Sequence, residues 1–241
     1  MQYADGRLEE RTRGTPQGGV ISPLLANLFL HYAFDIWMQK HWTGIWFERY
    51  ADDVLCHCET EHQAQMLRES LEERFKACGL ILHPTKTQIV YCKDDRRRGT
   101  YPNTSFDFLG FEFRGRTAID RQGRCFIGFN PGISPAKVRG IRDRIRSMVG
   151  SRQYGWSLRR LASRINPYIR GWWNYYGKFF RSELEYRVGR FLDVRVLHWA
   201  RRKFRRLRDS RRKAWLWLYR LRRSQPPLFA HWSNDRMRRA V

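Results

Sequence analysis

Acidic residues are scarce in this sequence relative to basic ones. The 241 residues include 47 Lys and Arg but only 23 Asp and Glu, which gives a formal net charge of +24. The scarcity is local: residues 1–132 hold 17 basic and 17 acidic side chains, whereas residues 133–241 hold 30 and 6. This asymmetry predicts two functional units. The strongly basic part favours a polyanionic partner, and nucleic acid is the default.

Long apolar runs and cysteine pairs are also missing. A membrane surface is the competing partner, but no unbroken apolar run is long enough to span a bilayer, and the start shows no secretory signal. The five cysteines form no C-x-x-C pair, and Cys56-His57-Cys58 is too closely spaced for the usual zinc knuckles. We expect reduced structural thiols in a cytoplasmic protein. The hydrophobic fraction of 42% permits a real core and excludes a disordered basic tail.

Two adjacent carboxylates, Asp52 and Asp53, stand between two short runs that favour β-strand. The runs, Ile45-Trp46-Phe47 and Val54-Leu55, are rich in aromatic and β-branched residues. A tight strand-turn-strand places the carboxylates at its tip. Neighbouring carboxylates repel, so a cation or basic group must be close if both are ionised, and hard oxygen ligands of this kind suit Mg²⁺. The competing interpretation is a solvated turn.

A glycine-rich loop, Gly14-Thr15-Pro16-Gln17-Gly18-Gly19, precedes this pair. Its glycines allow the backbone to approach a ligand closely. Ser22-Pro23 then has the pattern of a helix start. Apolar residues at helical spacing predict a buried face on this helix, formed by Leu24, Leu25, Leu28, Phe29, Ala33, Ile36 and Trp37. An ordinary loop leading into a helix is the alternative.

These two motifs resemble those of the reverse transcriptases encoded by group II introns. Tyr50-Ala51-Asp52-Asp53 is similar to the catalytic Y-A-D-D motif of that family, and residues 14–19 are similar to its T-P-Q-G-G motif, which lines the pocket of the nascent base pair. The resemblance implies two-metal phosphoryl transfer. Asp52 and Asp53 would hold Mg²⁺, with an RNA template, a DNA primer and deoxynucleoside triphosphates as partners. The implied nucleotide pocket consists of Thr15, Pro16, Gln17, Gly18, Gly19, Tyr50 and Ala51.

Two later segments extend the resemblance. Lys86 stands where the family has a lysine near the incoming triphosphate, which implies that it protonates the leaving pyrophosphate. Phe108, Leu109, Gly110 and Phe111 resemble the F-L-G-F segment that grips the primer strand. A solvated lysine and a plain half-buried hairpin are the alternatives.

The remaining patterns of the first part favour an α+β fold. Thr60 and Gln63 form a capping box for a helix that Gly79 ends. Residues 80–82 and 88–91 are expected to be strands, and Cys125–Phe129 is expected to pair with the alternating segment 106–113. Together they favour helices on one face of an antiparallel sheet, which fits the part of a reverse-transcriptase palm that the resemblance implies.

The basic part has the pattern of a helical domain. Ser134 and Ser157 begin helices, Asn166-Pro167 is expected to break the second, and a long helix is expected over residues 183–208. The aromatic run 168–177 resembles the maturase-specific segment of group II intron proteins, also called the X or thumb domain. We expect RNA-backbone contacts from Arg170, Lys178, Arg201, Arg202, Arg205 and Arg206. Aromatic and basic residues interleave again over residues 211–223, a mixture that suits stacked bases and phosphates.

The predicted domains are a C-terminal portion of the palm (residues 1–131), an all-α thumb or X domain (132–208) and a basic aromatic extension (209–241). In the family another catalytic Asp comes from a strand that precedes the T-P-Q-G-G loop, and no such strand is recognisable here. The sequence is therefore interpreted as a truncated form without the fingers, and a separate chain is a candidate source of the missing half.

Two functions follow from the resemblance. One is an RNA-directed DNA polymerase and intron maturase; the other is a non-catalytic RNA-binding maturase module that assists intron splicing. The absent carboxylate strand favours the second for the isolated chain and leaves its enzymatic activity open. A DNA-binding regulator is the weaker third interpretation, because no compact helix-turn-helix stands apart from the thumb pattern.

Overall fold

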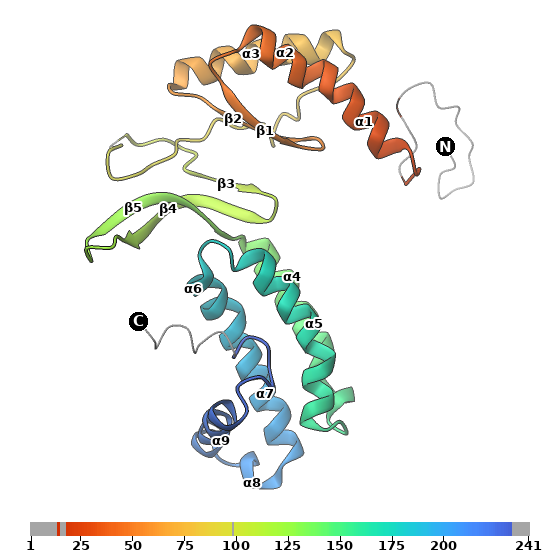
Figure 1. The fold of residues 1–241 in the computed structure, drawn as a ribbon, viewed down its shortest axis with the longest axis vertical. Coiled ribbons are helices and arrows are strands. Elements are labelled where there is room, and N and C mark those ends of the chain that lie inside the picture. Colours follow the sequence, from red (N-terminus) through yellow and green to blue (C-terminus); the bar gives the residue numbers. More distant parts are fainter. Residues whose placement is uncertain (1–13, 15–17, 98, 233–241) are drawn as a thin grey trace. The chain divides into compact units, whose positions relative to one another are not determined.

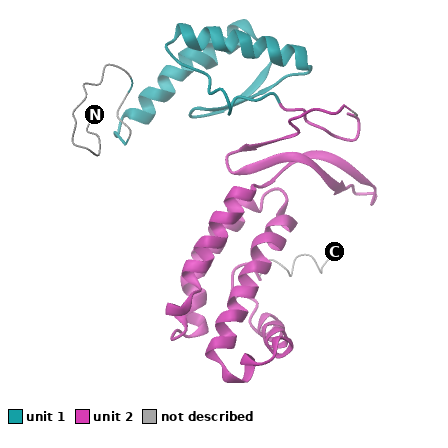
Figure 2. Cartoon of the chain, turned by 180° about the vertical axis from the view of Figure 1, so that it is seen from behind, with its two compact units in different colours: residues 1–89 teal, residues 90–241 magenta. Residues whose placement is uncertain are grey.

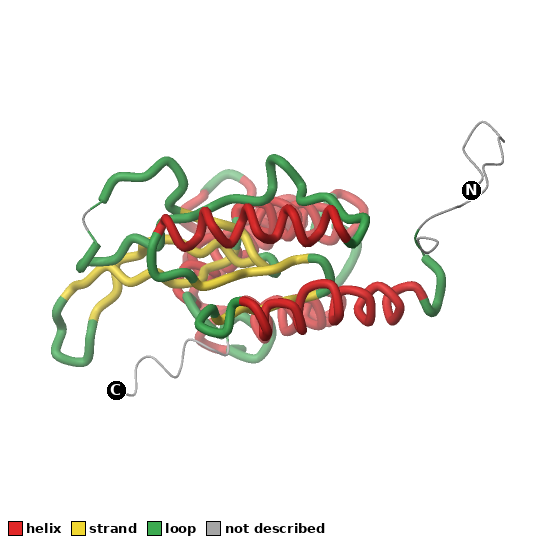
Figure 3. Tube along the Cα trace, turned by 90° about the horizontal axis from the view of Figure 1, so that it is seen from above, coloured by secondary structure: helices red, strands yellow, loops and turns green. Residues whose placement is uncertain are grey.

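A computed structural model describes residues 14, 18–97 and 99–232 of the chain. The chain divides after Ile89 into two compact units, coloured separately in Figure 2. Helices and strands, red and yellow in Figure 3, both contribute, which confirms the predicted α+β class. Among the described residues, none of the helices is both long and apolar enough to cross a bilayer.

The first unit is built on a short hairpin and a set of helices (Figure 1). Its elements in chain order are α1 (Ser22–Leu30), the π-helical turn η1 (His31–Asp35), α2 (Ile36–His41), β1 (Trp46–Tyr50), β2 (Asp53–His57) and α3 (Glu61–Ala77). The core consists of Phe34, Met38, Ile45 and Leu67, all buried, with one face of the hairpin packed against them.

The second unit combines a three-stranded sheet with a helical bundle (Figure 1). Its elements in chain order are β3 (Ser105–Phe108), β4 (Phe111–Ile119), β5 (Cys125–Ile133), α4 (Pro135–Met148), the 3₁₀ turn η2 (Ser151–Gln153), α5 (Leu158–Tyr176), α6 (Arg181–Leu184), the π-helical turn η3 (Glu185–Gly189), α7 (Arg190–Lys203), α8 (Arg205–Arg208) and α9 (Arg211–Ser224). The strands are antiparallel in the order β3-β4-β5. Residues 125–129 do form a strand beside β4, but they pair with residues 115–119 and not with the predicted segment 106–113, which folds back on itself as the β3–β4 hairpin.

The apolar face of α1 is exposed, contrary to the prediction. Leu24 is 66% exposed, Leu28 51% and Phe29 47%. The prediction fails for α1 because none of the described elements of the first unit lies over this face. The predicted burial is found about one turn further along the chain, where Ala33 is only 3% exposed.

Helix α3 begins and ends as its sequence predicts. The Thr60 hydroxyl accepts a hydrogen bond from the Gln63 backbone N–H, and the Gln63 side chain accepts one from the Glu59 N–H. The first bond satisfies a donor that the first helical turn leaves free, and the second ties the residue before the N-cap to the helix. At the other end Gly79 has φ +72°, and the Leu80 N–H donates to the Phe75 carbonyl.

The strands expected over residues 80–82 and 88–91 do not form. Both segments lie in irregular backbone, and Pro84 starts a turn between them. The Tyr91 N–H donates to the Asn103 carbonyl, but neither segment belongs to a strand. Apolar runs this short become strands only where a partner strand lies alongside.

Arg116 on β4 joins the sheet to the helical bundle of the second unit. Its guanidinium is buried and makes ion pairs with Glu112 (3.0 Å) and Glu183 (2.5 Å), besides donating to the Asn130 carbonyl. Gly132 leaves room for this group, because a Cβ there would lie 2.7 Å from the Arg116 guanidinium carbon. Burial lowers the pKa of Arg116, but arginine remains charged in proteins. The contact therefore depends on both carboxylates.

Helix α5 continues through Pro167, although Asn166-Pro167 was expected to break it. Leu161, Ile165 and Ile169 recur every four residues and are fully buried. Burying such a side chain stabilises by about 1.5–3 kcal/mol, so three of them exceed the roughly 3 kcal/mol that an interior proline costs. Packing therefore overrides the local signal.

Arginines in both units bind backbone carbonyls of neighbouring helices. Arg74 of α3 donates to the Ala33 carbonyl in the π-helical turn η1, and Arg142 of α4 donates twice to the Arg187 carbonyl in η3. Arg195 of α7 donates to the Val149 carbonyl at the end of α4 (2.7 Å). Wide π turns and helix ends leave carbonyls without an intrahelical donor, and the guanidinium groups supply one.

The segment after α9 closes the bundle through two buried polar residues. Asn166 of α5 donates to the Leu228 carbonyl and accepts from the Ala230 N–H, both at 2.9 Å. Asp193 of α7 accepts bonds from the Trp232 indole (2.8 Å) and from His231 (3.0 Å). These bonds fix the path of residues 228–232 over the core.

We predict that Asn166→Ala lowers the free energy of unfolding of the second unit by about 2 kcal/mol, because two buried hydrogen bonds are lost. Asn174→Ala, on the exposed side of the same helix, is the matched control and should change stability little. Denaturant unfolding of the full chain, followed by circular dichroism, measures both. Equal effects of the two substitutions would contradict the role given to Asn166.

Candidate active site and nucleic-acid interface

The two carboxylates lie at the tip of the β1–β2 hairpin. Tyr50 pairs with Asp53, so Ala51 and Asp52 form a two-residue turn. Ala51 has φ +54°, a left-handed conformation that costs a non-glycine residue roughly 1–2 kcal/mol. Asp52 and Asp53 are both exposed, and Tyr50 beside them is 65% exposed. The hairpin thus places both carboxylates at its tip, as the sequence predicts, and both are exposed there.

Arg49 braces this turn from behind. Its guanidinium forms a two-pronged bond with Asp35, with Nε–Oδ1 at 2.7 Å and Nη2–Oδ2 at 2.6 Å. The remaining nitrogen, Nη1, donates to Asn27 Oδ1 (2.9 Å) and to the Ala51 carbonyl (3.1 Å). One side chain therefore ties the strained turn to α1 and η1. This brace holds the peptide immediately before Asp52.

The ion pair between Asp35 and Arg49 shifts the pKa of each partner toward its charged form. The hydrogen bond from Arg49 is the main reason that the pKa of Asp35 lies below its usual value; partial burial acts in the opposite direction, and His31 lowers the pKa further. The same bond raises the pKa of Arg49. A carboxyl with a depressed pKa stabilises the fold above its unfolded pKa, and this contribution disappears as the pH falls through the folded pKa.

The donors at the hairpin tip fit one Mg²⁺ shared with a substrate. Mg²⁺ prefers oxygen ligands and is usually held by one or two carboxylates together with substrate phosphates and water. Asp52 and Asp53 supply two such carboxylates without a competing internal ion pair among the described residues. Within the same part of the chain, no cluster of three or more His, Cys, Asp or Glu side chains could hold a metal by itself. The pair is therefore suited to a metal that arrives with phosphates.

Other predicted pocket residues are only partly placed. Thr15, Pro16 and Gln17 lie outside the described residues, whereas Gly18 is exposed and Gly19 half-buried. Lys86 is exposed in the turn after His83, and no ion pair between it and Asp52 or Asp53 is found in the region that the structure describes. Its role remains a prediction.

The F-L-G-F segment forms the turn between β3 and β4. Phe108 pairs with Phe111, and Leu109 and Gly110 occupy the turn at φ +52° and +79°. The Leu109 carbonyl accepts a bond from the Tyr175 hydroxyl of α5 (2.9 Å). Phe111 is buried against three aromatic rings of the bundle, those of Tyr175, Tyr176 and Phe179. In the second unit this segment thus packs the sheet against the helices, and it remains a candidate primer contact.

The six basic residues expected to contact RNA fall into two groups. Arg201 donates to the Arg208 carbonyl, and Arg202 lies over the Tyr154 ring at 5.8 Å, so both have roles within the fold. Arg202 is exposed even so, as are the other four, Arg170, Lys178, Arg205 and Arg206, for which no such contact is found in the described part of the chain. This second group is better placed to reach phosphates.

The cysteines do not form a metal or redox site in the described chain. All five are free thiols. Burial, followed by repulsion from Cys58 and Glu48, raises the pKa of Cys56 to about 12. A neutral, desolvated thiol is a poor nucleophile, which agrees with a structural role.

Comparison with known families agrees with this geometry. Residues 3–113 match the family described as reverse transcriptase (RNA-dependent DNA polymerase), and residues 138–217 match the group II intron, maturase-specific domain. The chain belongs to the group II intron reverse transcriptases and maturases, as its motifs predict. The family points to a divalent metal cofactor and to intron RNA as a nucleic-acid partner. A comparison with curated proteins finds no match.

Sequence reasoning missed the residues behind the hairpin. Asp35, Asn27 and Arg49 are far apart in the sequence, and none belongs to a motif identified there. The available signal was the position of Arg49, which lies two residues from Phe47 and therefore on the inward face of the strand. An arginine on that face requires an acceptor, and Asp35 is the acceptor found.

We predict that Arg49→Gln increases hydrogen exchange at residues 50–53 without unfolding the hairpin, because the Ala51 carbonyl loses its brace. His57→Gln is the control: His57 is bonded to Glu48 on the same hairpin, but both side chains are more than half exposed. Exchange measured by mass spectrometry distinguishes the variants. The wild-type protection should persist from neutral pH down to about pH 4 and decline below it, as Asp35 is protonated. Equal exchange in both variants would exclude the brace.

Proposed function

We propose that the chain is an intron maturase that binds structured intron RNA and supplies the Asp52–Asp53 pair to an RNA-directed DNA polymerase centre. The observation that carries this proposal is the hairpin tip: two exposed adjacent carboxylates on a two-residue turn that Arg49 holds from behind. A plain solvated turn does not require a left-handed alanine braced by a half-buried ion pair. Strain of this kind is typical of sites where geometry matters.

The proposed roles follow from the placement of each side chain. Asp52 and Asp53 hold the cation and so orient the triphosphate and primer end that bind with it. When bound, Mg²⁺ stabilises charge on the transferring phosphoryl group. Tyr50 and the glycine loop shape the nucleotide pocket, and Lys86 donates the proton to the leaving pyrophosphate. Phe108–Phe111 contacts the primer strand.

A second protein segment is the proposed source of the remaining polymerase groups. The exposed apolar face of α1, including Leu24, Leu28 and Phe29, supports a protein contact there, because monomeric proteins rarely leave such a face uncovered. A separate chain that docks on this face would supply a third carboxylate. The alternative function, RNA binding without catalysis, is favoured by the absence of a third ligand beside the pair among the described residues.

The proposed division of labour places the palm-derived part at residues 1–131, the RNA-binding helical domain at 132–208 and a basic extension at 209–241. The charge distribution supports it, because residues 133–241 carry the whole net charge of +24. Long-range attraction of RNA therefore comes from the helical part.

We predict that Fe²⁺, used in place of Mg²⁺ with ascorbate, cleaves the chain near residues 50–54 when a primed template and triphosphates are present. Asp52→Asn should abolish this cleavage and any template-dependent primer extension, while RNA binding stays unchanged. Glu59→Gln is the control, since Glu59 is an exposed carboxylate just after β2. Cleavage that persists in Asp52→Asn would exclude the metal assignment, and RNA binding without localised cleavage would favour the non-catalytic alternative.

We predict that Arg205→Gln/Arg206→Gln weakens binding of the full chain to an intron-like RNA hairpin and flattens its salt dependence. Each phosphate contact contributes about 0.7–0.9 to the slope of log affinity against log salt, so two lost contacts reduce it by about 1.4–1.8. The control is Arg68→Gln/Lys76→Gln, which removes two exposed charges from α3 in the neutral part. Titrations at several salt concentrations give the slopes. An equal change in the control would show that only total charge matters.

A further inference from the structure

Helix α9 presents two different faces. Ala214 and Leu218 are buried at 1% and 3% exposure, and Trp217 packs beside them against the bundle core. On the other side Trp215 is 45% exposed and Tyr219 is 53% exposed. The aromatic run of this helix therefore divides: Trp217 is structural, whereas Trp215 and Tyr219 lie in solvent four residues apart on neighbouring turns.

All the charged residues of α9 are basic. The helix contains six Arg and Lys residues and no Asp or Glu. Arg222 turns inward toward Asp193 (3.5 Å). Arg220 and Arg223 face the other way, and in the part of the chain that the structure describes no carboxylate pairs with either of them. Their charge is available to a ligand.

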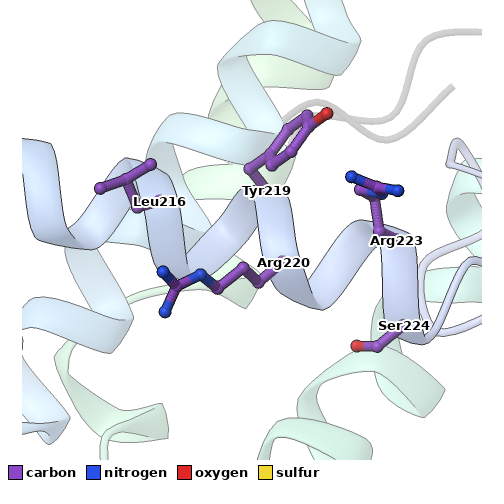
Figure 4. A pocket seen from close by; sticks show the side chains of 5 residues that line it. All are labelled: Leu216, Tyr219, Arg220, Arg223 and Ser224. Atoms are coloured by element: carbon purple, nitrogen blue, oxygen red, sulfur yellow. The ribbon is translucent and has the colours of Figure 1, made fainter.

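A shallow open hollow brings these groups together (Figure 4). It has a volume of about 480 Å³ and is lined by Leu216, Tyr219, Arg220, Arg223 and Ser224. The Arg223 guanidinium lies 5.9 Å from the centre of the Tyr219 ring, while Arg220 extends from the same helix in a different direction. An exposed aromatic ring with one guanidinium group beside it and a second on the same helix matches a nucleobase with neighbouring phosphates.

We propose that this face of α9, which we call the α9 platform (Trp215, Leu216, Tyr219, Arg220 and Arg223), binds unpaired RNA nucleotides by stacking a base on Tyr219. Bases within a duplex are stacked on one another and offer no free face, so the platform selects single-stranded segments such as loops and bulges. Arg220 and Arg223 contact the adjoining phosphates. This inference rests on the proposed RNA-binding function and adds to it a site that distinguishes unpaired from paired RNA.

The chain contains a natural control for this site. Tyr186 and Arg190 form another exposed pair four residues apart, with the guanidinium also 5.9 Å from the ring centre and Tyr186 68% exposed. Two acidic residues, Glu183 and Glu185, precede Tyr186 closely in the sequence. Ring and guanidinium have the same spacing in both places, but only the α9 platform has a purely basic helix around it.

The test compares Tyr219→Leu with Tyr186→Leu in the full chain, using fluorescence anisotropy with three RNA probes. The probes are a short unpaired oligonucleotide, the same oligonucleotide with abasic sites at its centre, and a duplex of equal phosphate number. Tyr219→Leu should weaken binding of the unpaired probe about tenfold, within the range that one stacked base contributes. It should leave duplex binding unchanged. Tyr186→Leu should change neither.

The abasic probe separates stacking from charge. The wild-type chain should bind it about tenfold more weakly than the intact strand, and Tyr219→Leu should cause no further loss, because both changes remove one contact. Equal affinity for abasic and intact strands, or equal effects of the two leucine variants, overturns the platform while duplex binding still supports the proposed function. Failure of the wild-type chain to bind any of the probes overturns the proposed function itself. Binding to anionic vesicles that Tyr219→Leu abolishes, with RNA binding unaffected, would assign the face to a lipid surface instead.

Discussion

Guanidinium groups that bind backbone carbonyls determine how this protein holds its helices together. Residues 133–241 contain 30 basic side chains and only 6 acids, so most arginines cannot find a carboxylate. Arg142 and Arg195 instead donate to carbonyls in η3 and at the end of α4. Arg116 takes up Glu183, one of these few acids, to join the sheet to the bundle. The shortage of carboxylates thus constrains the fold, because an arginine that packs against a neighbouring helix needs a backbone carbonyl there that has no intrahelical donor.

The same interaction links the fold to the candidate active site. Arg49 bridges Asp35, Asn27 and the Ala51 carbonyl, and Asp35 is the last residue of the π-helical turn η1. Arg74 satisfies a carbonyl that this turn leaves open. The geometry of the Asp52–Asp53 turn therefore depends on an irregular helical segment some fifteen residues earlier in the sequence. Two arginines stabilise that segment, Arg49 through the Asp35 carboxylate and Arg74 through the Ala33 carbonyl.

Local signals were enough to predict the hairpin around Asp52, the helix starts at Ser134 and Ser157, and the end of α3 at Gly79. Each depends on residues close in sequence, for which turn and capping preferences are strong. The errors occur where distant packing decides. Pro167 is accommodated because the buried face of α5 outweighs its cost, and residues 80–82 lack a partner strand. The partners of Arg49 could not be predicted either, because no local pattern specifies which carboxylate an inward-facing arginine binds.

Because arginines bound to backbone carbonyls hold the helices together, salt should weaken RNA binding by this protein much more than it weakens the fold. Mobile ions screen contacts between exposed charges and RNA phosphates strongly, but they screen a partly buried guanidinium–carbonyl bond much less. Arg142 and Arg195 form bonds of this kind. A concentrated salt wash should therefore strip RNA from this highly basic chain and leave its helical bundle assembled, which makes salt a clean way to obtain the protein free of nucleic acid.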